Sequence, residues 1–412
     1  MWGTNTHRTE GEVCLMQEPQ HPIAIVGGGP AGALAGAVLA TGGKKVILLD
    51  EKLAWEKPCG GGVTHKALEQ YPFLRDVQSE YRTVEDCELI SPSGQRARFH
   101  LRNPVAIFSR FALNEKLLER ARRAGAELRK ERVTRIAGKA GDWLLSTPQG
   151  EFRASYVVLA AGARNSFRGQ FSKPISAGDL MVTAGYFIPG RASLMQVQFL
   201  KGISGYIWIF PRADHISTGI AGKMGETSTA ALRRTLERWL GDNGFNLEGA
   251  QFYSHILPAL RPETIAALEV SGNGWALIGD SAGLVDPITG EGLYYALRSA
   301  ELCAGALLAA EPEQYAAQLE EEILPELQLA ARVAHRFYNG KVFGESVLER
   351  MVALTQRSAT CRELLCDLFA GIQGYRDLRT RLYRSLPAML AEMLASRLRG
   401  ALRIRRPSTS SA

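Results

Sequence analysis

A glycine-rich turn between an apolar strand and a small-residue helix restricts the fold of this chain more than any other feature. Residues 22–26 form an apolar run, the sequence Gly27-Gly28-Gly29-Pro30-Ala31-Gly32 follows it, and residues 31–41 are mostly small. A second apolar run, residues 45–49, ends directly before Asp50. This order predicts a strand–helix–strand unit that binds a dinucleotide, because the turn presents bare backbone N–H groups at a helix N-terminus to a pyrophosphate.

The residues of this turn have separate expected roles in cofactor binding. Gly27 makes the turn, Gly29 lets the backbone approach the ligand, and Gly32 lets the helix pack closely on the strand, with Pro30 and Ala31 between them. The acidic residue after the second strand is expected to accept hydrogen bonds from ribose hydroxyls. Asp50 takes this role because it directly follows the strand, and Glu51 is the alternative.

A second glycine-rich segment follows another apolar strand, residues 275–278. It reads Gly279-Asp280-Ser281-Ala282-Gly283 and continues through Pro287 to Gly290-Glu291-Gly292, where a helix is expected to begin. Asp280 is expected to bind the sugar-like chain of a flavin, and the helix start to stabilise negative charge on a reduced flavin ring. The set of cofactor-binding residues here is Gly279, Asp280, Pro287, Gly290 and Gly292. An ordinary strand–loop–helix is the alternative for this segment taken alone.

Composition and charge narrow the class of protein. The 412 residues are 46% apolar and 22% charged, as in ordinary globular proteins, and the net charge of +7 favours anionic partners. Nucleic acid is not expected, because no basic tract is interleaved with aromatic residues. The six cysteines include no CxxC pair and the seven histidines no HxxxH or HExxH spacing, so no metal site is predicted.

Location is predicted from the same features. The scattered single cysteines, the polar start of the chain and the lack of an apolar run of about 18 residues indicate a cytoplasmic protein. Near the end, Leu386, Met389, Leu390, Met393, Leu394 and Leu398 recur at helical spacing beside Arg397, Arg399, Arg403, Arg405 and Arg406. Such a helix lies either on an anionic membrane surface, which makes the protein peripheral to the membrane, or in the core with a solvated basic end.

Taken together, these motifs resemble those of a known superfamily. Gly27 to Gly32, Asp50, Arg110, Ala160-Ala161-Gly162-Ala163 and Gly279 to Gly292 resemble the FAD-dependent reductases and monooxygenases related to para-hydroxybenzoate hydroxylase. Within that superfamily, Lys57-Pro58-Cys59-Gly60-Gly61-Gly62-Val63 and Gly205-Tyr206-Ile207-Trp208-Ile209-Phe210-Pro211 resemble the geranylgeranyl reductase family.

The resemblance implies roles for several residues. Arg110 packs on the FAD, Ala161 and Gly162 lie beside it, and Gly61 and Gly62 lie beside the isoalloxazine ring. Cys59 is the catalytic candidate, as a proton donor, and a buried structural thiol is the alternative. The period-two alternation of Tyr206, Trp208 and Phe210 puts their rings on one strand face, which in the family lines the substrate cavity; a plain sheet core is the alternative.

The implied fold class is α/β, with a Rossmann-like FAD-binding domain, an inserted antiparallel-sheet substrate domain and a helical C-terminal region. The expected divisions are a flexible extension (1–20), the first part of the FAD-binding domain (21–175, with a substrate-side segment near 58–105), the substrate domain (176–270), the last part of the FAD-binding domain (271–310) and the helical region (311–412).

The implied activity is hydride transfer from reduced FAD to carbon–carbon double bonds of an isoprenoid or other apolar substrate. One alternative is an FAD-dependent monooxygenase, a hydroxylase or epoxidase acting on a small aromatic or apolar molecule, and another is a non-catalytic FAD-binding electron carrier. Ala161-Gly162 stands where the superfamily often has Asp-Gly, which weighs against a hydroxylase-type cycle. NAD(P)H or another electron donor is expected, without a Rossmann domain of its own, because no second GxGxxG occurs.

Overall fold

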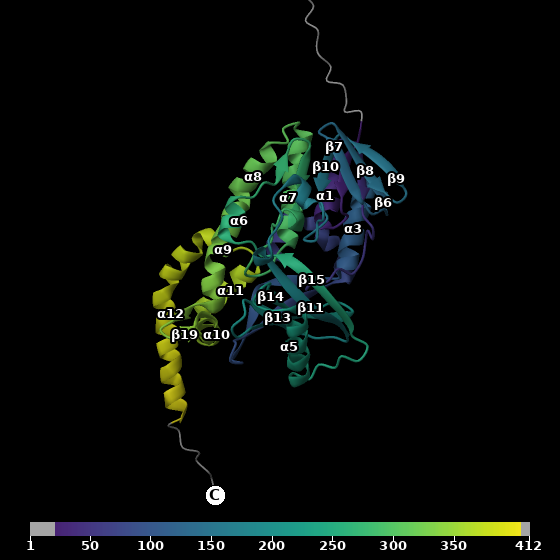
Figure 1. Cartoon of the computed structure of the whole chain (residues 1–412). Coiled ribbons are helices and arrows are strands. Elements are labelled where there is room, and N and C mark those ends of the chain that lie inside the picture. The colour runs from purple at the N-terminus through teal and green to yellow at the C-terminus, as the bar shows by residue number, and fades with distance from the viewer. Residues whose placement is uncertain (1–20, 405–412) are drawn as a thin grey trace, which may run out of the picture.

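The computed structural model describes residues 21–404, so the expected N-terminal extension and Arg405 and Arg406 lie outside the described residues. Its first sheet joins strands that are far apart in the sequence, in the order β16-β17-β10-β1-β2-β6 (Figure 1). These strands are β1 (Ile23–Val26), β2 (Val46–Leu49), β6 (Glu127–Arg129), β10 (Tyr156–Leu159), β16 (Ser271–Gly272) and β17 (Trp275–Leu277). All neighbours run parallel except β16, so the loops that follow β1, β2, β10 and β17 emerge at one edge.

Helix α1 (Pro30–Thr41) packs between α3 (Arg110–Arg123) and α7 (Leu293–Leu308) beside this sheet. The contact depends on small residues, which make up most of α1 and are buried along its length. At Gly32 an added Cβ would lie 1.9 Å from the carbonyl oxygen of Gly27, so only glycine permits this approach of the helix to the turn.

The second sheet has eight strands in the order β15-β11-β14-β13-β12-β4-β5-β3. They are β3 (Gly62–Val63), β4 (Tyr81–Ile90), β5 (Arg96–Phe108), β11 (Leu180–Pro189), β12 (Met195–Phe199), β13 (Gly205–Pro211), β14 (His215–Lys223) and β15 (Gln251–Pro258). The neighbours are antiparallel except for the parallel pair β12 and β4. Residues 62–108 therefore supply three strands to the same sheet as residues 180–258.

Each face of the second sheet has its own covering. Helix α5 (Thr229–Asp242) packs on β11 and β14, and its Leu232, Leu236 and Leu240 form one apolar cluster with Ile207 and Ile209 of β13. Toward β5 the sheet is covered by α10 (Val347–Arg357) and α11 (Ala359–Phe369).

The C-terminal region is helical, as expected. It contains α8 (Gln314–Glu322), α9 (Leu324–Asn339), the hairpin of β18 (Lys341–Val342) and β19 (Glu345–Ser346), then α10, α11 and α12 (Tyr375–Ile404). Helix α12 runs along the outer edge of the molecule (Figure 1). Between residues 21 and 404 no helix has both the length and the apolar character needed to cross a membrane.

The smaller elements fill the remaining positions. Strands β7 (Arg135–Lys139), β8 (Asp142–Thr147) and β9 (Gly150–Ala154) form a separate sheet, whose Trp143 and Leu145 join the core around α1. The short helices are α2 (His65–Gln70), α4 (Arg168–Phe171) and α6 (Pro262–Ala266), and 3-10 turns span Pro72–Glu80, Ala177–Asp179 and Gly279–Ser281.

The close contact at Gly32 should make alanine costly there. We expect Gly32→Ala to lower the free energy of unfolding by about 2 kcal/mol or more, because its Cβ would meet backbone that has no room to move. Gly305→Ala is the matched control: this exposed position in α7 has no atom within 4 Å of an added Cβ, so alanine should stabilise the protein by roughly 0.5–1 kcal/mol. Urea unfolding monitored by circular dichroism measures both; equal stabilities of the two variants would contradict the close contact.

Candidate functional site

One cavity brings together loops of the first sheet and strands of the second. Its lining from the FAD-binding elements includes Gly29, Pro30, Ala31, Arg110, Ala160, Gly162, Ile278, Asp280, Gly290, Glu291 and Gly292. Its lining from the substrate-side elements includes Cys59, Gly60, Gly61, Gly62, Tyr206, Trp208, Phe210, His255 and Leu257. Leu368 and Phe369 of α11 complete it. Most of the residues predicted as site residues thus meet around a single cavity.

The three glycines of the N-terminal turn divide into two roles. An added Cβ at Gly29 would meet no atom within 4 Å, so this backbone is open to the cavity. Gly27 has a φ of +111°, and its Cβ would lie 2.4 Å from the carbonyl oxygen of Ala160. Gly27 and Gly32 therefore permit protein packing, whereas the backbone at Gly29 faces open space, and its contact with a cofactor stays a prediction.

Asp50 holds the glycine turn in place. Its carboxylate accepts hydrogen bonds from the backbone N–H groups of Gly28 (2.7 Å), Lys52 (2.7 Å) and Leu53 (2.6 Å). Glu51 is exposed and forms an ion pair with Arg132 at 3.7 Å. Neither acidic side chain lines the cavity, so a ribose role for Asp50 or Glu51 stays a prediction.

Arg110 brings a positively charged side chain to the cavity. It is the first residue of α3, is only 3% exposed, and its Nε has no hydrogen-bond partner within the described part of the chain. A buried N–H donor that lacks a hydrogen-bond acceptor is unfavourable unless a ligand supplies one. Together with the open backbone at Gly29, the Arg110 guanidinium with its unsatisfied Nε fits the pyrophosphate of a dinucleotide.

Asp280 lies in the 3-10 turn that follows β17, and its carboxylate lies near the start of α7. It forms an ion pair with Lys57, Nζ to Oδ2 at 3.2 Å. Burial raises the pKa of Asp280, but the Lys57 charge and hydrogen bond outweigh it, so the pKa lies below its ordinary value and the carboxylate is ionised. A Cβ at Gly292 would lie 3.2 Å from Asp280 Oδ1, so glycine leaves the start of α7 open to this carboxylate.

The other residues predicted beside the cofactor differ in their access to the cavity. Gly162 lines it with a φ of +75°, whereas Ala161 is exposed outside it. Gly279, with a φ of +57°, packs against Ala31 and Ala296, and Pro287 is buried in its loop; neither lines the cavity. Their direct contact with a cofactor therefore stays a prediction.

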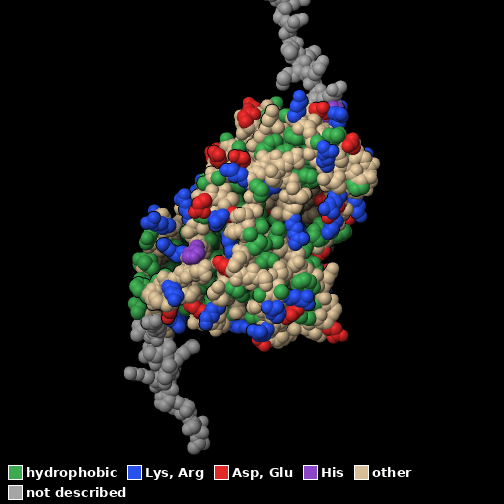
Figure 2. All heavy atoms as spheres, viewed as in Figure 1, with side chains coloured by type: hydrophobic (Ala, Val, Ile, Leu, Met, Phe, Trp, Pro, Cys, Tyr) green, Lys and Arg blue, Asp and Glu red, His purple; other side chains and the backbone are tan. Residues whose placement is uncertain are grey.

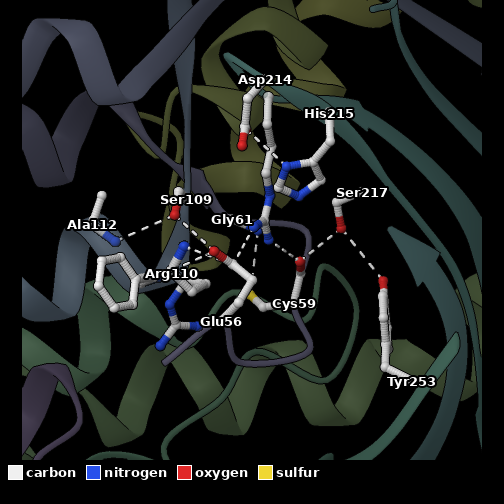
Figure 3. A network of polar contacts seen from close by, with 12 residues as sticks. Glu56, Cys59, Gly61, Ser109, Arg110, Ala112, Asp214, His215, Ser217 and Tyr253 are labelled. Atoms are coloured by element: carbon white, nitrogen blue, oxygen red, sulfur yellow. Dashed lines mark hydrogen bonds and ion pairs between the residues drawn. The ribbon is translucent and has the colours of Figure 1, made fainter. Parts of the chain in front are cut away.

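An ion pair between a fully buried guanidinium and a partly exposed carboxylate connects both sides of the cavity (Figure 3). The guanidinium of Arg212, which directly follows β13, is fully buried, pairs with Glu56 and donates to the carbonyl oxygen of Cys59 at 2.6 Å. Glu56 also accepts hydrogen bonds from the Ser109 hydroxyl (2.7 Å) and the Arg110 backbone N–H (2.9 Å). One carboxylate thus caps the start of α3, at which Arg110 lies, and neutralises a cation of the second sheet.

The same network sets the environment of Cys59. Its Sγ accepts a hydrogen bond from the Gly61 backbone N–H at 3.3 Å, and its carbonyl oxygen also accepts one from the Ser217 hydroxyl at 2.8 Å. Burial raises the pKa of the Cys59 thiol, but the charges of Arg110, Arg212 and Lys57 and the Gly61 hydrogen bond together bring it below its ordinary value. The structure therefore favours the thiolate of Cys59 more than a neutral site would.

Another part of the cavity lining is aromatic. Tyr206, Trp208 and Phe210 all line it, so the face predicted from their spacing is the cavity face of β13. Two of these rings pack directly against glycines, where a side chain would clash. A Cβ at Gly60 would lie 2.6 Å from the Phe210 ring, and one at Gly219 would lie 2.3 Å from the Trp208 indole. The result is an aromatic surface in the same cavity as the charged side chains.

Several site residues had no role in the sequence analysis. Glu56 and Arg212 are 156 positions apart, and no spacing rule connects them. His255, Leu368 and Phe369 lie in segments that show no motif. Glu291 stood inside a recognised segment, but only the structure shows that its side chain lines the cavity.

Comparison with known proteins agrees with this geometry. The family described as FAD dependent oxidoreductase matches residues 57–310, more than half of the chain. A chloroplastic geranylgeranyl diphosphate reductase of Arabidopsis thaliana is 26% identical over 69% of this chain. A digeranylgeranylglycerophospholipid reductase of Methanoculleus marisnigri is 27% identical over 69% of this chain and 75% of its own length.

The match to the plant protein covers 65% of that protein's length, so the chain spans slightly less than two thirds of it. Among solved structures, a geranylgeranyl bacteriochlorophyll reductase-like protein of Thermoplasma acidophilum aligns with a TM-score of 0.73 over 91% of this chain and 99% of its own, at 18% identity. This likeness confirms the predicted α/β fold.

Removing the charge of Glu56 tests how much the stability of the protein depends on its ion pair with Arg212. We expect Glu56→Gln to lower the free energy of unfolding at pH 7 by about 3 kcal/mol, because it leaves the buried Arg212 without its counter-charge. Burial raises the pKa of Glu56, but the Arg212 charge and the surrounding hydrogen bonds outweigh it and hold the pKa below its usual value of 4.5. The ionised carboxylate therefore makes its full contribution to the free energy of unfolding above about pH 4.5 and loses it as the pH falls through the folded-state pKa. Stability measured against pH should thus decline less steeply in acid for Glu56→Gln than for the wild type.

Glu119→Gln is the control, since Glu119 forms its ion pairs with Arg122 and Arg123 on the surface of α3. It should change stability little. Equal stabilities of Glu56→Gln and the wild type at pH 7 would contradict the supporting role of the buried pair.

Proposed function

Because this chain belongs to the FAD-dependent oxidoreductases, we propose that it reduces carbon–carbon double bonds of an isoprenoid or similarly apolar substrate. The observation that carries this proposal is that one cavity is lined both by Arg110, whose buried Nε has no hydrogen-bond partner among the described residues, and by the aromatic face of β13. The names of the relatives support the substrate class, since they describe reductases of geranylgeranyl compounds.

When bound and reduced, FAD supplies a hydride and with it both electrons of the reduction. Arg110 and the open backbone at Gly29 would hold the pyrophosphate. Asp280, kept ionised by Lys57, would accept hydrogen bonds from the polyol chain. NAD(P)H or another external reductant would supply the electrons.

The aromatic end would hold the substrate. Tyr206, Trp208 and Phe210 supply flat apolar surfaces against which a methyl-branched chain packs without losing hydrogen bonds. The Tyr206 hydroxyl is already occupied, because it donates to the carbonyl oxygen of Thr289 at 2.7 Å. The glycines at 60, 61 and 62 bring the backbone of the Cys59 segment to the same space, so substrate and cofactor would meet beside Cys59.

We also propose that α12 contacts an anionic membrane surface, where a lipid substrate would be found. Met389 is buried in the helical region, but a stripe of other apolar side chains on α12 is exposed: Leu382, Tyr383, Leu386, Leu390 and Leu394. Apolar side chains gather along this edge of the molecule in Figure 2. Farther along the same helix the sequence places Arg397, Arg399 and Arg403, and basic residues beside an apolar stripe favour anionic lipid.

Anaerobic photometry tests the proposed reaction. Protein loaded with FAD is reduced with dithionite and mixed with geranylgeranyl diphosphate or a polyprenyl lipid without oxygen. We expect the oxidised flavin absorbance to return and the product mass to rise by two hydrogens for each double bond reduced. Reoxidation that requires oxygen, with an oxygen atom in the product, would instead establish the monooxygenase alternative.

Replacing the aromatic face tests where the substrate lies. We expect Trp208→Ala to raise the KM for an isoprenoid about tenfold or more, since it removes a large apolar contact, and to leave the affinity for FAD nearly unchanged. Trp239→Ala is the matched control, because this indole packs on Phe245 outside the cavity. A loss of FAD affinity in Trp208→Ala equal to the loss of substrate affinity would argue against separate cofactor and substrate ends.

Cosedimentation with vesicles tests the membrane contact. The wild type should bind phosphatidylcholine vesicles that contain phosphatidylglycerol and bind pure phosphatidylcholine vesicles more weakly. The double variant Leu390→Glu/Leu394→Glu should lose this binding, whereas Phe252→Glu, which alters an exposed apolar residue on β15, should keep it. Unchanged binding of the double variant would remove α12 as the contact.

A further inference from the structure

We propose that the carboxyl group of Glu291 donates the proton that completes the reduction of the double bond. This inference rests on the proposed function and names the residue that acts as its acid. Glu291 lies between the second glycine-rich segment and the start of α7, and its half-buried side chain lines the cavity. The neighbouring Gly290 lies against the hydroxyl of Tyr206, so Glu291 lies where the cofactor segment meets the aromatic strand.

A double bond gains one hydride and one proton when it is reduced. The hydride brings both electrons from reduced FAD to one carbon, and the other carbon forms its new bond to the proton of the Glu291 hydroxyl. The O–H bond breaks with its electron pair staying on the carboxylate, which then regains a proton from water. No oxidant is needed, and the external reductant restores the cofactor.

The remaining titratable groups that line the cavity are unsuited to this role. Asp280 is ionised beside Lys57, and the hydroxyl proton of Tyr206 is directed to the Thr289 carbonyl oxygen. Burial lowers the pKa of His255 to about 3, so its imidazole is neutral at pH 7 and carries no acidic proton for transfer.

Lys57 is the counter-charge of Asp280, and Arg110 would be that of a bound pyrophosphate. A proton transferred from either side chain would leave its anion without that counter-charge. Cys59 has a lowered pKa, and its Sγ accepts the Gly61 N–H, so its surroundings favour the thiolate more than those of an ordinary cysteine do. Among the described lining residues, Glu291 is left as the group whose protonated form suits donation.

The surroundings of Glu291 fit an acid that works near neutral pH. The Thr64 hydroxyl, at the start of α2, donates to Glu291 Oε1 at 2.9 Å. Burial raises the pKa of Glu291 to about 7, and the nearby Asp286 carboxylate raises it too, whereas the Thr64 hydrogen bond and the Lys66 charge lower it. From α11 the cavity receives only the apolar Leu368 and Phe369. A general acid is most effective when its pKa lies near the working pH.

The carboxylate that remains after proton transfer is also accommodated. The Thr64 hydrogen bond favours the charged form, and the N-terminus of α7, which begins at Leu293, stabilises a nearby negative charge. Thr64 is therefore a positioning residue: it fixes the orientation of the carboxyl group and adjusts its pKa, and it does not transfer the proton.

The main test is single-turnover reoxidation of reduced, FAD-loaded protein by geranylgeranyl diphosphate without oxygen. We expect Glu291→Gln, which keeps an acceptor for Thr64, to slow reoxidation about 100-fold or more, with FAD affinity and the rate of reduction by dithionite unchanged. Cys59→Ala should retain the wild-type pH profile. Reoxidation of Glu291→Gln within about threefold of the wild type would overturn the inference, as would loss of the pH dependence in Cys59→Ala.

The pH dependence supplies a second readout. The reoxidation rate should be highest below about pH 7 and fall above it, because the acid must be protonated. Thr64→Val removes a hydrogen bond that favours the carboxylate, so the decline should move to higher pH, whereas Thr64→Ser should leave it in place. A purely structural role of Thr64 would lower the melting temperature without moving the profile.

Infrared spectroscopy of the oxidised, substrate-free protein provides a readout that does not depend on turnover. A protonated carboxyl band should titrate near pH 7 in the wild type and be missing from Glu291→Gln. Absence of that band in the wild type overturns the acid role even if double bonds are reduced. If the wild type is not reoxidised by any isoprenoid, the proposed function itself fails and the assignment of Glu291 falls with it.

Discussion

The buried pair of Glu56 and Arg212 is the contact on which the site depends. A fully buried guanidinium would be strongly unfavourable alone, so the loop that carries Glu56 must meet the second sheet at the end of β13. The same carboxylate binds the first backbone N–H groups of α3, which fixes Arg110 at the cavity, and Arg212 in turn fixes the carbonyl oxygen of Cys59. One ion pair with a fully buried guanidinium thereby connects the start of α3, the Cys59 segment and the end of β13.

Glycine determines how closely the remaining parts approach that centre. Gly27 and Gly32 remove side chains where backbone meets backbone, and Gly60 and Gly219 remove them where aromatic rings lie flat. Gly29 removes one where open space remains. The chain thus forms a cavity with a cationic end and an aromatic end, and the low polarity around the buried groups strengthens each electrostatic contact within it.

The C-terminal helices contact the loop that leads to the cavity. Tyr375, the first residue of α12, donates to the buried carboxylate of Asp286 at 2.8 Å, and Tyr338 of α9 donates to the carbonyl oxygen of Ile288 at 2.6 Å. Both bonds hold the loop that leads to Glu291. Burial raises the pKa of Asp286 even though several hydrogen bonds act against it, so this loop holds a second carboxyl group in a weakly polar environment. The helix that carries the exposed apolar stripe is therefore joined by one hydrogen bond to the loop beside the proposed acid.

The sequence by itself determined the strand–turn–helix unit, the approximate bounds of β1, α1, β2 and β17, and the common face of Tyr206, Trp208 and Phe210. These features are local: a glycine pattern, a helical or two-residue period and a nearby acidic residue are each complete within about 25 positions. The hairpin of β4 and β5 was expected only as a substrate-side segment, and the sheet of β7 to β9 and helix α5 were not predicted. Their patterns are short, and their partners lie elsewhere in the chain.

Only the tertiary structure decided which distant groups meet. The pairing of Glu56 with Arg212, the approach of Thr64 to Glu291 across 227 positions and the entry of Leu368 and Phe369 into the cavity have no local signal. The protonation of Cys59, Asp280 and Glu291 follows the same rule, because a pKa depends on burial and on charges brought close by folding, and neither is fixed by the neighbours of a residue along the chain.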